Sequence, residues 1–259
     1  MITVTSLASP IGEIVVRRRI QTGALVYEEG ECCQSETDED GISLSSYIHA
    51  LFSLIWQKRS QRVLMIGCGG GTLATLLVRA GIQVTVVDNN PDAFSLARKY
   101  FQMPAKVKCV VADGFDYLKV CGEFYDAVVL DAYNGSKIPD HLRSLQFLKL
   151  VRRRLDRADG IFLANVYLHH DLDLTADRMI QIANTIWHEV ALLDTRLYSC
   201  RNSIVLAGAI NNIALPKLMV RPTTRSIVMD VELSHLKFRG GRLGRVFIAM
   251  DRLRRLTSH

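Results

Sequence analysis

The sequence of 259 residues lacks the cysteine and histidine patterns of disulfide-rich and zinc-binding proteins. It has no Cys-x-x-Cys pair and no His at the spacing of a zinc ligand. We therefore expect no metal site and reduced thiols in a cytoplasmic protein. The six cysteines are Cys32, Cys33, Cys68, Cys109, Cys121 and Cys200.

Long apolar runs are also missing. No stretch approaches the roughly 20 apolar residues that a membrane-spanning helix needs. The N-terminal stretch MITVTSLASPIGEIVVRRR lacks the signal-peptide order of basic residues followed by an apolar segment. We therefore expect a soluble protein without a membrane partner.

The charge is unevenly distributed along the chain. There are 32 Lys and Arg against 26 Asp and Glu, with 49% hydrophobic and 22% charged residues, and these ordinary proportions exclude a disordered polypeptide. Residues 217–259 hold ten of the basic residues and three of the acids, so residues 1–216 are close to neutral. We expect nucleic acid to bind, if at all, through this basic tail. The stretch RVFIAMDRLRR favours a helix that docks on the core or on a second subunit, and we expect a homodimer.

Three parts are predicted along the chain. Residues 1–42 contain a small β-meander over about 13–36, with Gly23 and Gly30 at its turns. Residues 43–210 form an α/β, Rossmann-like domain, and residues 211–259 form a basic C-terminal extension.

Within the central part, apolar runs of strand length alternate with helical patterns. The runs lie at 63–67, 84–88, 107–113, 125–131 and 161–168, and long helices are predicted over about 138–155 and 173–188. Buried strands that alternate with helices predict a parallel sheet covered on both faces. Only the five residues YSCRN separate the last two strand-like segments, so these should form an antiparallel hairpin at the end of the sheet.

A glycine loop follows the first of these strands and opens a helix. Its glycines, Gly67, Gly69 and Gly71, allow a tight turn and a close backbone approach to a ligand. Asp88 ends the next strand, where an acidic side chain can accept hydrogen bonds from both hydroxyls of a ribose. The pattern predicts a nucleoside cofactor. NAD stays as an alternative, although Thr72 replaces the last glycine of the usual dinucleotide motif.

Two further strands also end in acids. Asp113, followed by Gly114, ends the third strand and Asp131 ends the fourth. Ligands of open α/β sheets bind outside the carboxyl ends of the strands, so Asp88, Asp113 and Asp131 should line one crevice.

These motifs together resemble a known family. VLMIGCGGGTLA, VVDNNPDAFSLARKYF, VVADGFDYL and YDAVVLDAYNG are similar to the class I S-adenosylmethionine-dependent transferases, and more closely to their spermidine synthase (polyamine aminopropyltransferase) branch. The resemblance covers most of residues 13–209 and implies the class I methyltransferase fold. It also implies a donor substrate, S-adenosylmethionine or its decarboxylated form, and a small-molecule amine acceptor.

The resemblance also implies roles for single residues. The donor-binding residues would be Gly67, Gly69 and Gly71 under the methionine part, Asp88 with Asn89 at the ribose, and Asp113 with Gly114 at the adenine. Asp131 would be the general base that removes a proton from the amine, with Tyr133 and Asn134 shaping the acceptor site.

The sequence departs from this branch at three acidic positions. Gly70 stands where the branch has an aspartate in the glycine loop, Asn134 stands where it has its second acid, and His49 stands where a glutamate follows Tyr47. A buried ammonium needs a compensating charge, so these changes predict weaker diamine binding. Two alternatives to aminopropyl transfer therefore stay open: a methyltransferase acting on a small molecule, and a non-catalytic binding protein that kept the fold.

Overall fold

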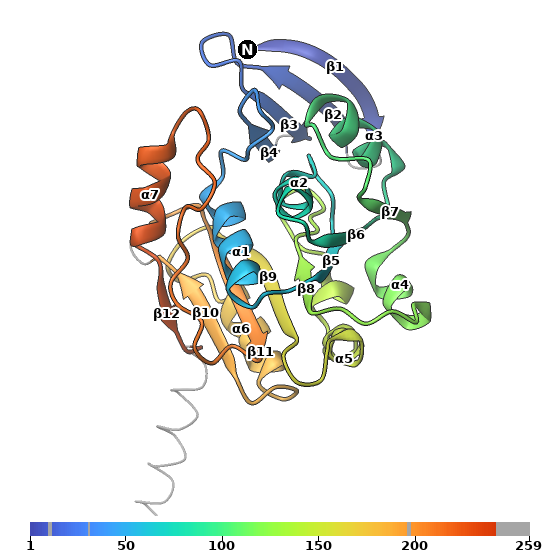
Figure 1. The fold of residues 1–259 in the computed structure, drawn as a ribbon, viewed down its shortest axis with the longest axis vertical. Coiled ribbons are helices and arrows are strands. Elements are labelled where there is room, and N and C mark those ends of the chain that lie inside the picture. Colours follow the sequence, from blue (N-terminus) through green and yellow to red (C-terminus); the bar gives the residue numbers. More distant parts are fainter. Residues whose placement is uncertain (10–11, 31, 196–197, 242–259) are drawn as a thin grey trace, which may run out of the picture.

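The computed structural model describes residues 1–9, 12–30, 32–195 and 198–241, in which two β-sheets are connected by helix α1 (Ser46–Gln57) (Figure 1). The first sheet contains four antiparallel strands in chain order: β1 (Ile2–Ser9), β2 (Gly12–Arg18), β3 (Leu25–Glu29) and β4 (Cys32–Thr37). The predicted meander corresponds to β2–β4, with positive φ angles at the turn residues Gly23 and Gly30. Strand β1 was not predicted, because most of its side chains are exposed and it lacks a buried apolar face.

The second sheet has eight strands in the order β12-β10-β11-β9-β8-β5-β6-β7. Strands β5 to β9 are parallel, as predicted, and β10 and β11 form the predicted antiparallel hairpin, with β11 paired to β9. Their bounds are β5 (Arg62–Ile66), β6 (Gln83–Asp88), β7 (Lys108–Val111), β8 (Ala127–Leu130), β9 (Ile161–Leu168), β10 (Val190–Asp194), β11 (Arg201–Gly208) and β12 (Lys237–Arg239). The α/β fold class predicted from the sequence is confirmed.

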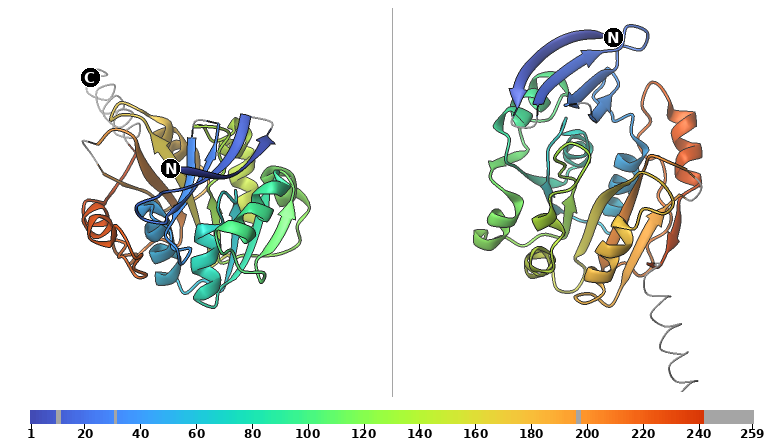
Figure 2. Two further views of the ribbon diagram at one scale, coloured as in Figure 1. Left: turned by 90° about the horizontal axis from the view of Figure 1, so that it is seen from above. Right: turned by 180° about the vertical axis from the view of Figure 1, so that it is seen from behind.

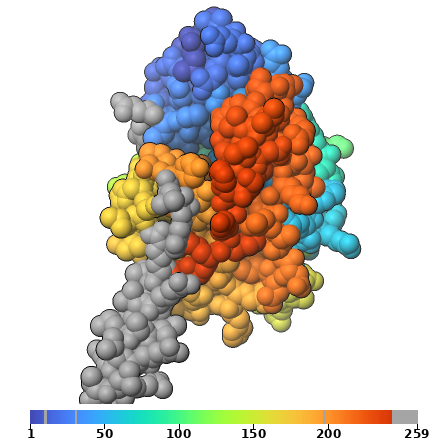
Figure 3. Space-filling model, turned by 90° about the vertical axis from the view of Figure 1, so that its left-hand side faces the viewer, coloured from blue at the N-terminus to red at the C-terminus, as the bar shows by residue number. Residues whose placement is uncertain are grey.

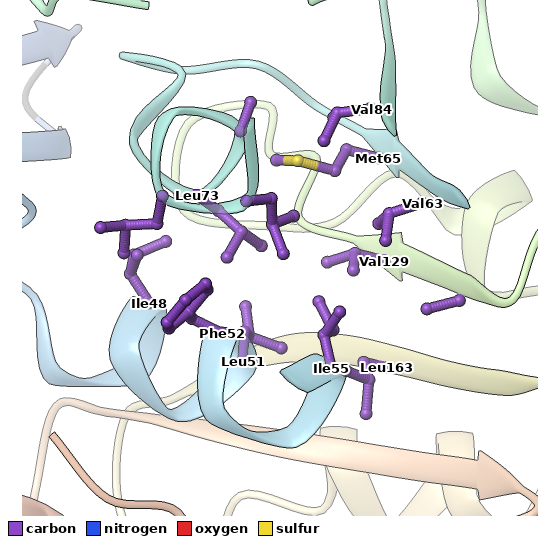
Figure 4. Close-up of a cluster of buried hydrophobic side chains, with 14 of the residues drawn as sticks. Ile48, Leu51, Phe52, Ile55, Val63, Met65, Leu73, Val84, Val129 and Leu163 are labelled. Atoms are coloured by element: carbon purple, nitrogen blue, oxygen red, sulfur yellow. The ribbon is translucent and has the colours of Figure 1, made fainter. Parts of the chain in front are cut away.

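Helices cover both faces of this sheet (Figure 2). One face packs on α1, α2 (Thr72–Arg79) and α3 (Pro91–Tyr100), and the other on α4 (Gly114–Val120), α5 (Leu145–Arg154) and α6 (Thr175–Ala183). Side chains of a strand alternate between the faces, so Val63 and Met65 of β5 meet Ile55 and Leu73 on the first face, as Figure 4 shows. The strands therefore read as continuous apolar runs because both of their faces are buried.

Two predicted helices are shorter than expected. The helix predicted over 138–155 divides into a short 3-10 helix, Asp140–Arg143, and α5, because the Ser144 side chain accepts a hydrogen bond from the Phe147 backbone N–H (3.1 Å) and caps α5 there. The helix predicted over 173–188 is α6, which ends at Ala183. None of the helices in the described ranges is long and apolar enough to cross a membrane.

The described part of the C-terminal segment packs on the core (Figure 3). Helix α7 (Ser226–Ser234) contacts α1, and β12 pairs with β10 at the sheet edge. Arg239 of β12 forms ion pairs with the fully buried Asp177 and Asp194, each at 3.0 Å. Asp194 also accepts from Arg201 at 2.8 Å, so the segment is attached to the domain through a buried ionic network. The predicted docking helix RVFIAMDRLRR lies outside the described residues.

We predict that this network stabilises the fold through Arg239. Arg239→Ala leaves two buried carboxylates without one of their cationic partners, so it should lower the free energy of unfolding by about 3 kcal/mol in urea denaturation. Lys237→Ala is the matched control, because Lys237 lies in the same strand with an exposed side chain, and it should change the stability by less than about 0.5 kcal/mol. Equal effects of the two substitutions would contradict the prediction.

Candidate active site

A cavity of about 880 Å³ lies between β3 and β4 of the first sheet and the carboxyl ends of β5 to β9. The three acids predicted to line one crevice all line this cavity, and so do the other predicted site residues except Gly71, the N-cap residue of α2. The predicted residues that line it are Gly67, Gly69, Asp88, Asn89, Asp113, Gly114, Asp131, Tyr133 and Asn134. None of the described lining residues is Lys or Arg, whereas five are acids. These acids are Glu29, Asp88, Asp92, Asp113 and Asp131. The cavity therefore favours a cationic ligand.

The glycine loop forms the floor of the cavity in a left-handed backbone conformation. The φ angles of Gly67, Gly69 and Gly71 are 100°, 49° and 66°, a region that favours glycine. A Cβ at Gly67 would overlap the backbone of Asp131, so this glycine also allows the loop after β5 to lie against the loop after β8. The Gly70 N–H donates to the Ser35 hydroxyl of β4 (3.0 Å), which joins the glycine loop to the first sheet.

Asp88 is held at the end of β6 by two backbone groups. Its carboxylate accepts from the Cys68 N–H at 2.7 Å and from the Asn90 N–H at 2.8 Å. Burial raises the pKa of Asp88, and these two hydrogen bonds partly offset the rise. Each carboxylate oxygen retains a lone pair, so the side chain can still accept hydrogen bonds from a ligand's hydroxyl groups.

Asp113 caps helix α4 and also binds a histidine that the sequence did not indicate. One carboxylate oxygen accepts from the Phe115 and Asp116 N–H groups, and the other lies 2.8 Å from Nε2 of His141. Burial acts to raise the pKa of Asp113, but these hydrogen bonds outweigh it and the pKa is lowered. Gly114 has no room for a side chain, because a Cβ there would overlap Ile66 of the sheet.

Asp131, at the end of β8, has two side-chain partners from other elements. Asn165 of β9 donates its amide Nδ2–H to one carboxylate oxygen (2.8 Å), and Tyr47 of α1 directs its hydroxyl at the other (3.4 Å). Burial raises the pKa of Asp131, while both hydrogen bonds act in the opposite direction. Burial and the nearby Asp131 raise the pKa of Tyr47, so its hydroxyl keeps its proton and serves as a donor.

Tyr133 and Asn134 differ in their surroundings. The Tyr133 hydroxyl donates to the Asn165 carbonyl oxygen (3.0 Å) and accepts from the Tyr167 N–H (2.8 Å), so it anchors the loop after β8 to β9. Asn134 is exposed, and its backbone forms a turn with Lys137. Both residues line the cavity, but Tyr133 has its hydroxyl engaged within the protein.

The sequence did not assign site roles to several residues that complete the cavity. Tyr47 and Asn165 reach Asp131 from α1 and β9, and Gln34 of β4 donates to the Gly135 carbonyl oxygen (3.2 Å). Each lies more than thirty positions from its partner in the chain, so no local motif could indicate the contact. His141 follows the loop after β8 at a position where the sequence showed only a helical pattern.

Two of the three positions that depart from the resembled branch, Gly70 and His49, have structural explanations. A Cβ at Gly70 would lie 3.0 Å from the Ser35 Cβ and 3.2 Å from the Phe101 ring, so an acidic side chain does not fit without displacement. His49 is fully buried, its Nε2–H donates to the Ser43 carbonyl oxygen (2.8 Å), and it does not line the cavity.

Among the described residues, no group of three or more His, Cys, Asp or Glu side chains is arranged to hold a metal ion.

Comparison with known proteins gives similarities in sequence. Residues 63–158 match the family description "Methyltransferase domain". The chain is 33% identical over 144 residues to a polyamine aminopropyltransferase of Chromobacterium violaceum, covering 52% of this chain and 54% of that protein. It is 34% identical over 110 residues to a polyamine aminopropyltransferase of Neisseria meningitidis serogroup A, covering 40% and 41%. The chain spans about half the length, or less, of the curated relatives that it matches.

Solved structures of spermidine synthases are also similar to this chain. A probable spermidine synthase from Corynebacterium glutamicum superposes with a TM-score of 0.74 at 18% identity, covering 94% of this chain and 92% of that one. The spermidine synthase of Thermotoga maritima superposes with a TM-score of 0.61 at 17% identity, covering 89% and 83%. At such identities the structures show a shared fold. With the sequence relatives, they confirm the resemblance predicted from the motifs.

We predict that burial raises the pKa of the Asp131 carboxyl group from its ordinary value and that Tyr47 limits this rise. Because the Tyr47 hydroxyl stabilises the ionised carboxylate, Tyr47→Phe should raise the pKa of Asp131 further, as measured by carbon-13 NMR of the side-chain carboxyl. Tyr100→Phe is the control, since Tyr100 lies on α3 outside the cavity lining. A lower pKa in the Tyr47→Phe protein would contradict the prediction.

Proposed function

We propose, from this spermidine synthase-like sequence and fold, that the chain is a transferase that moves an alkyl group from an S-adenosylmethionine-type sulfonium donor to an amine. The observation that carries the proposal is the arrangement of Asp131 beside the glycine loop: a base with a raised pKa lies at the carboxyl end of the strand next to the loop expected to bind the donor. The acids of the cavity suit both a sulfonium and an ammonium.

The donor fits the side of the cavity formed by β5, β6 and β7. Asp88 offers its carboxylate to the ribose hydroxyls, with Asn89 beside it. Asp113 and the cap of α4 face the adenine, and His141 shares the Asp113 carboxylate. The glycine loop lies under the chain of carbon atoms that bears the sulfonium.

Asp131 supplies the proton transfer that the reaction requires. A protonated amine has no lone pair, so the Asp131 carboxylate takes one N–H proton and the freed electron pair forms the new nitrogen–carbon bond. The carbon–sulfur bond breaks at the same carbon, its electron pair stays on sulfur, and the sulfonium leaves as a neutral thioether. Asn165 and Tyr47 orient the carboxylate, and the walls of the cavity hold the two substrates in line.

The transferred group is either aminopropyl or methyl. The names of the sequence relatives favour aminopropyl transfer from the decarboxylated donor. Methyl transfer is the second candidate, and Gly70 favours it. The loop carries no acid to compensate the ammonium of the decarboxylated donor, whereas S-adenosylmethionine carries its own carboxylate beside its ammonium. Turnover with S-adenosylmethionine or with its decarboxylated form, followed by mass spectrometry of the acceptor, separates the two.

Donor binding gives a first prediction for this function. Methylthioadenosine, which carries the nucleoside and thioether of the donor, should bind in isothermal titration calorimetry, and Asp88→Asn should weaken it by about tenfold, because one acceptor of the ribose hydroxyls is lost. Asp116→Asn is the control, since Asp116 lies on α4 outside the cavity lining. No binding to the wild-type protein at millimolar ligand would refute nucleoside recognition and with it the proposed function.

Loss of the base gives a second prediction. Asp131→Asn should lower turnover by about a hundredfold or more, because the amide cannot accept the amine proton, while methylthioadenosine affinity stays within about twofold. In the wild-type protein activity should fall as the pH drops below the raised pKa of Asp131, since only the ionised carboxylate acts as a base. Wild-type turnover in the Asp131→Asn protein would exclude Asp131 as the base.

A further inference from the structure

Tyr27 of β3 is a buried tyrosine in the wall of the cavity. The residue is only 2% exposed, and its ring meets the Phe101 ring edge-on, with the two centroids 6.1 Å apart. The rest of its surroundings is an apolar cluster between the first sheet and α3, formed by Ile14, Val16, Leu25 and Leu96. Packing therefore fixes the ring, while the residue still contacts the cavity.

The strand pairing directs Tyr27 toward the glycine loop. Tyr27 pairs with Ser35 of β4, and side chains at paired positions of antiparallel strands lie on the same face of a sheet. The Ser35 hydroxyl accepts the Gly70 N–H at 3.0 Å, and Phe101 packs beside Gly70 as well as beside Tyr27. Tyr27 and Ser35 thus project from the first sheet toward the loop expected to lie under the donor.

The Tyr27 hydroxyl forms no hydrogen bond within the part of the chain that the structure describes. Its oxygen is not enclosed in the core but remains accessible from the cavity. Burial raises the pKa of Tyr27, and the negative charges of Glu29 and Asp88 act in the same direction, so the hydroxyl keeps its proton. A ligand that accepts this proton would satisfy a donor that the described protein leaves without a partner.

Asp88 and Tyr27 offer complementary groups to a sugar hydroxyl. The Cys68 N–H donates to Asp88 at 2.7 Å, and both of these residues act electrostatically on Tyr27, so the three groups lie together at the end of β6. A ribose hydroxyl that donates to the Asp88 carboxylate keeps lone pairs on its own oxygen. A protonated tyrosine can donate to one of those lone pairs, which would satisfy both partners.

We infer that Tyr27 is a second ribose-binding residue, whose hydroxyl donates to the oxygen of a ribose hydroxyl that itself donates to Asp88. The inference rests on the proposed function and adds to it the residue that makes donor binding selective for ribose over deoxyribose. Because Phe101 and the surrounding cluster hold the ring, the Tyr27 hydroxyl is in place before the ligand binds, and little side-chain entropy is lost on binding.

Removal of one hydroxyl from the protein and one from the ligand tests this contact. Tyr27→Phe should weaken methylthioadenosine binding about tenfold in isothermal titration calorimetry, because one hydrogen bond to the ribose is lost. At least one of 2′-deoxy- and 3′-deoxy-methylthioadenosine lacks the hydroxyl that Tyr27 contacts. That analogue should bind the wild-type and Tyr27→Phe proteins with affinities within about twofold of each other. Equal losses for methylthioadenosine and both analogues overturn the inference.

Two controls separate this contact from a structural role of the residue. Tyr27→Phe should leave the midpoint of urea unfolding unchanged, because the hydroxyl has no partner in the described structure. A lowered midpoint together with equal losses for all three ligands would assign the hydroxyl to the fold and overturn the inference. Tyr100→Phe is the matched control, since Tyr100 packs against the same cluster outside the cavity lining, and it should keep methylthioadenosine affinity within about twofold.

Failure of the inference and failure of the proposed function give different results. Methylthioadenosine binding that Tyr27→Phe leaves unchanged refutes the role of Tyr27 alone. Absence of methylthioadenosine binding to the wild-type protein refutes the proposed function and the role of Tyr27 together.

Discussion

The site depends on one close approach between two loops of the sheet. Strands β5 and β8 are neighbours, and Gly67 after β5 lies so near the backbone of Asp131 after β8 that a side chain there would overlap it. This contact places the glycine loop and the carboxylate of Asp131 at the same edge of the sheet. Because the loops follow buried parallel strands, their positions are maintained by the packing of both sheet faces.

The rest of the cavity is built around this contact by elements that precede β5 and follow β8 in the chain. The first sheet covers the glycine loop through Ser35 and the loop after β8 through Gln34. Helix α1 brings Tyr47 to one oxygen of Asp131, and β9 brings Asn165 to the other. Burial removes the Asp131 carboxylate partly from water, and two neutral hydrogen-bond donors stabilise its ionised form. No cation is among its hydrogen-bond partners in the described structure.

The distribution of charge follows from the strand order. Acids end β6, β7 and β8, while the lining residues contributed by β9 and β11 are neutral. Among the described lining residues, the acids therefore lie on the side of the cavity formed by β5 to β8. Among the residues that the structure describes, no Lys or Arg of the C-terminal segment lines this cavity. Arg239, in the C-terminal part, instead closes a buried network with Asp177 and Asp194.

The sequence alone determined three features, because each is a local pattern with a local physical cause. The strand–helix alternation follows from burial of both strand faces, and the glycine loop follows from its positive φ angles. The acids at strand ends follow from the free edge of a parallel sheet. It could not indicate Tyr47, Asn165, His141 or Ser35 as partners of these groups, since no periodicity or spacing records which distant side chains meet. It also showed Gly70 only as a missing acid, whereas the structure shows that this position is packed tightly against Ser35 and Phe101. The tertiary structure decided these contacts, because the sheet order and the placement of the first sheet bring together residues that are far apart in the chain.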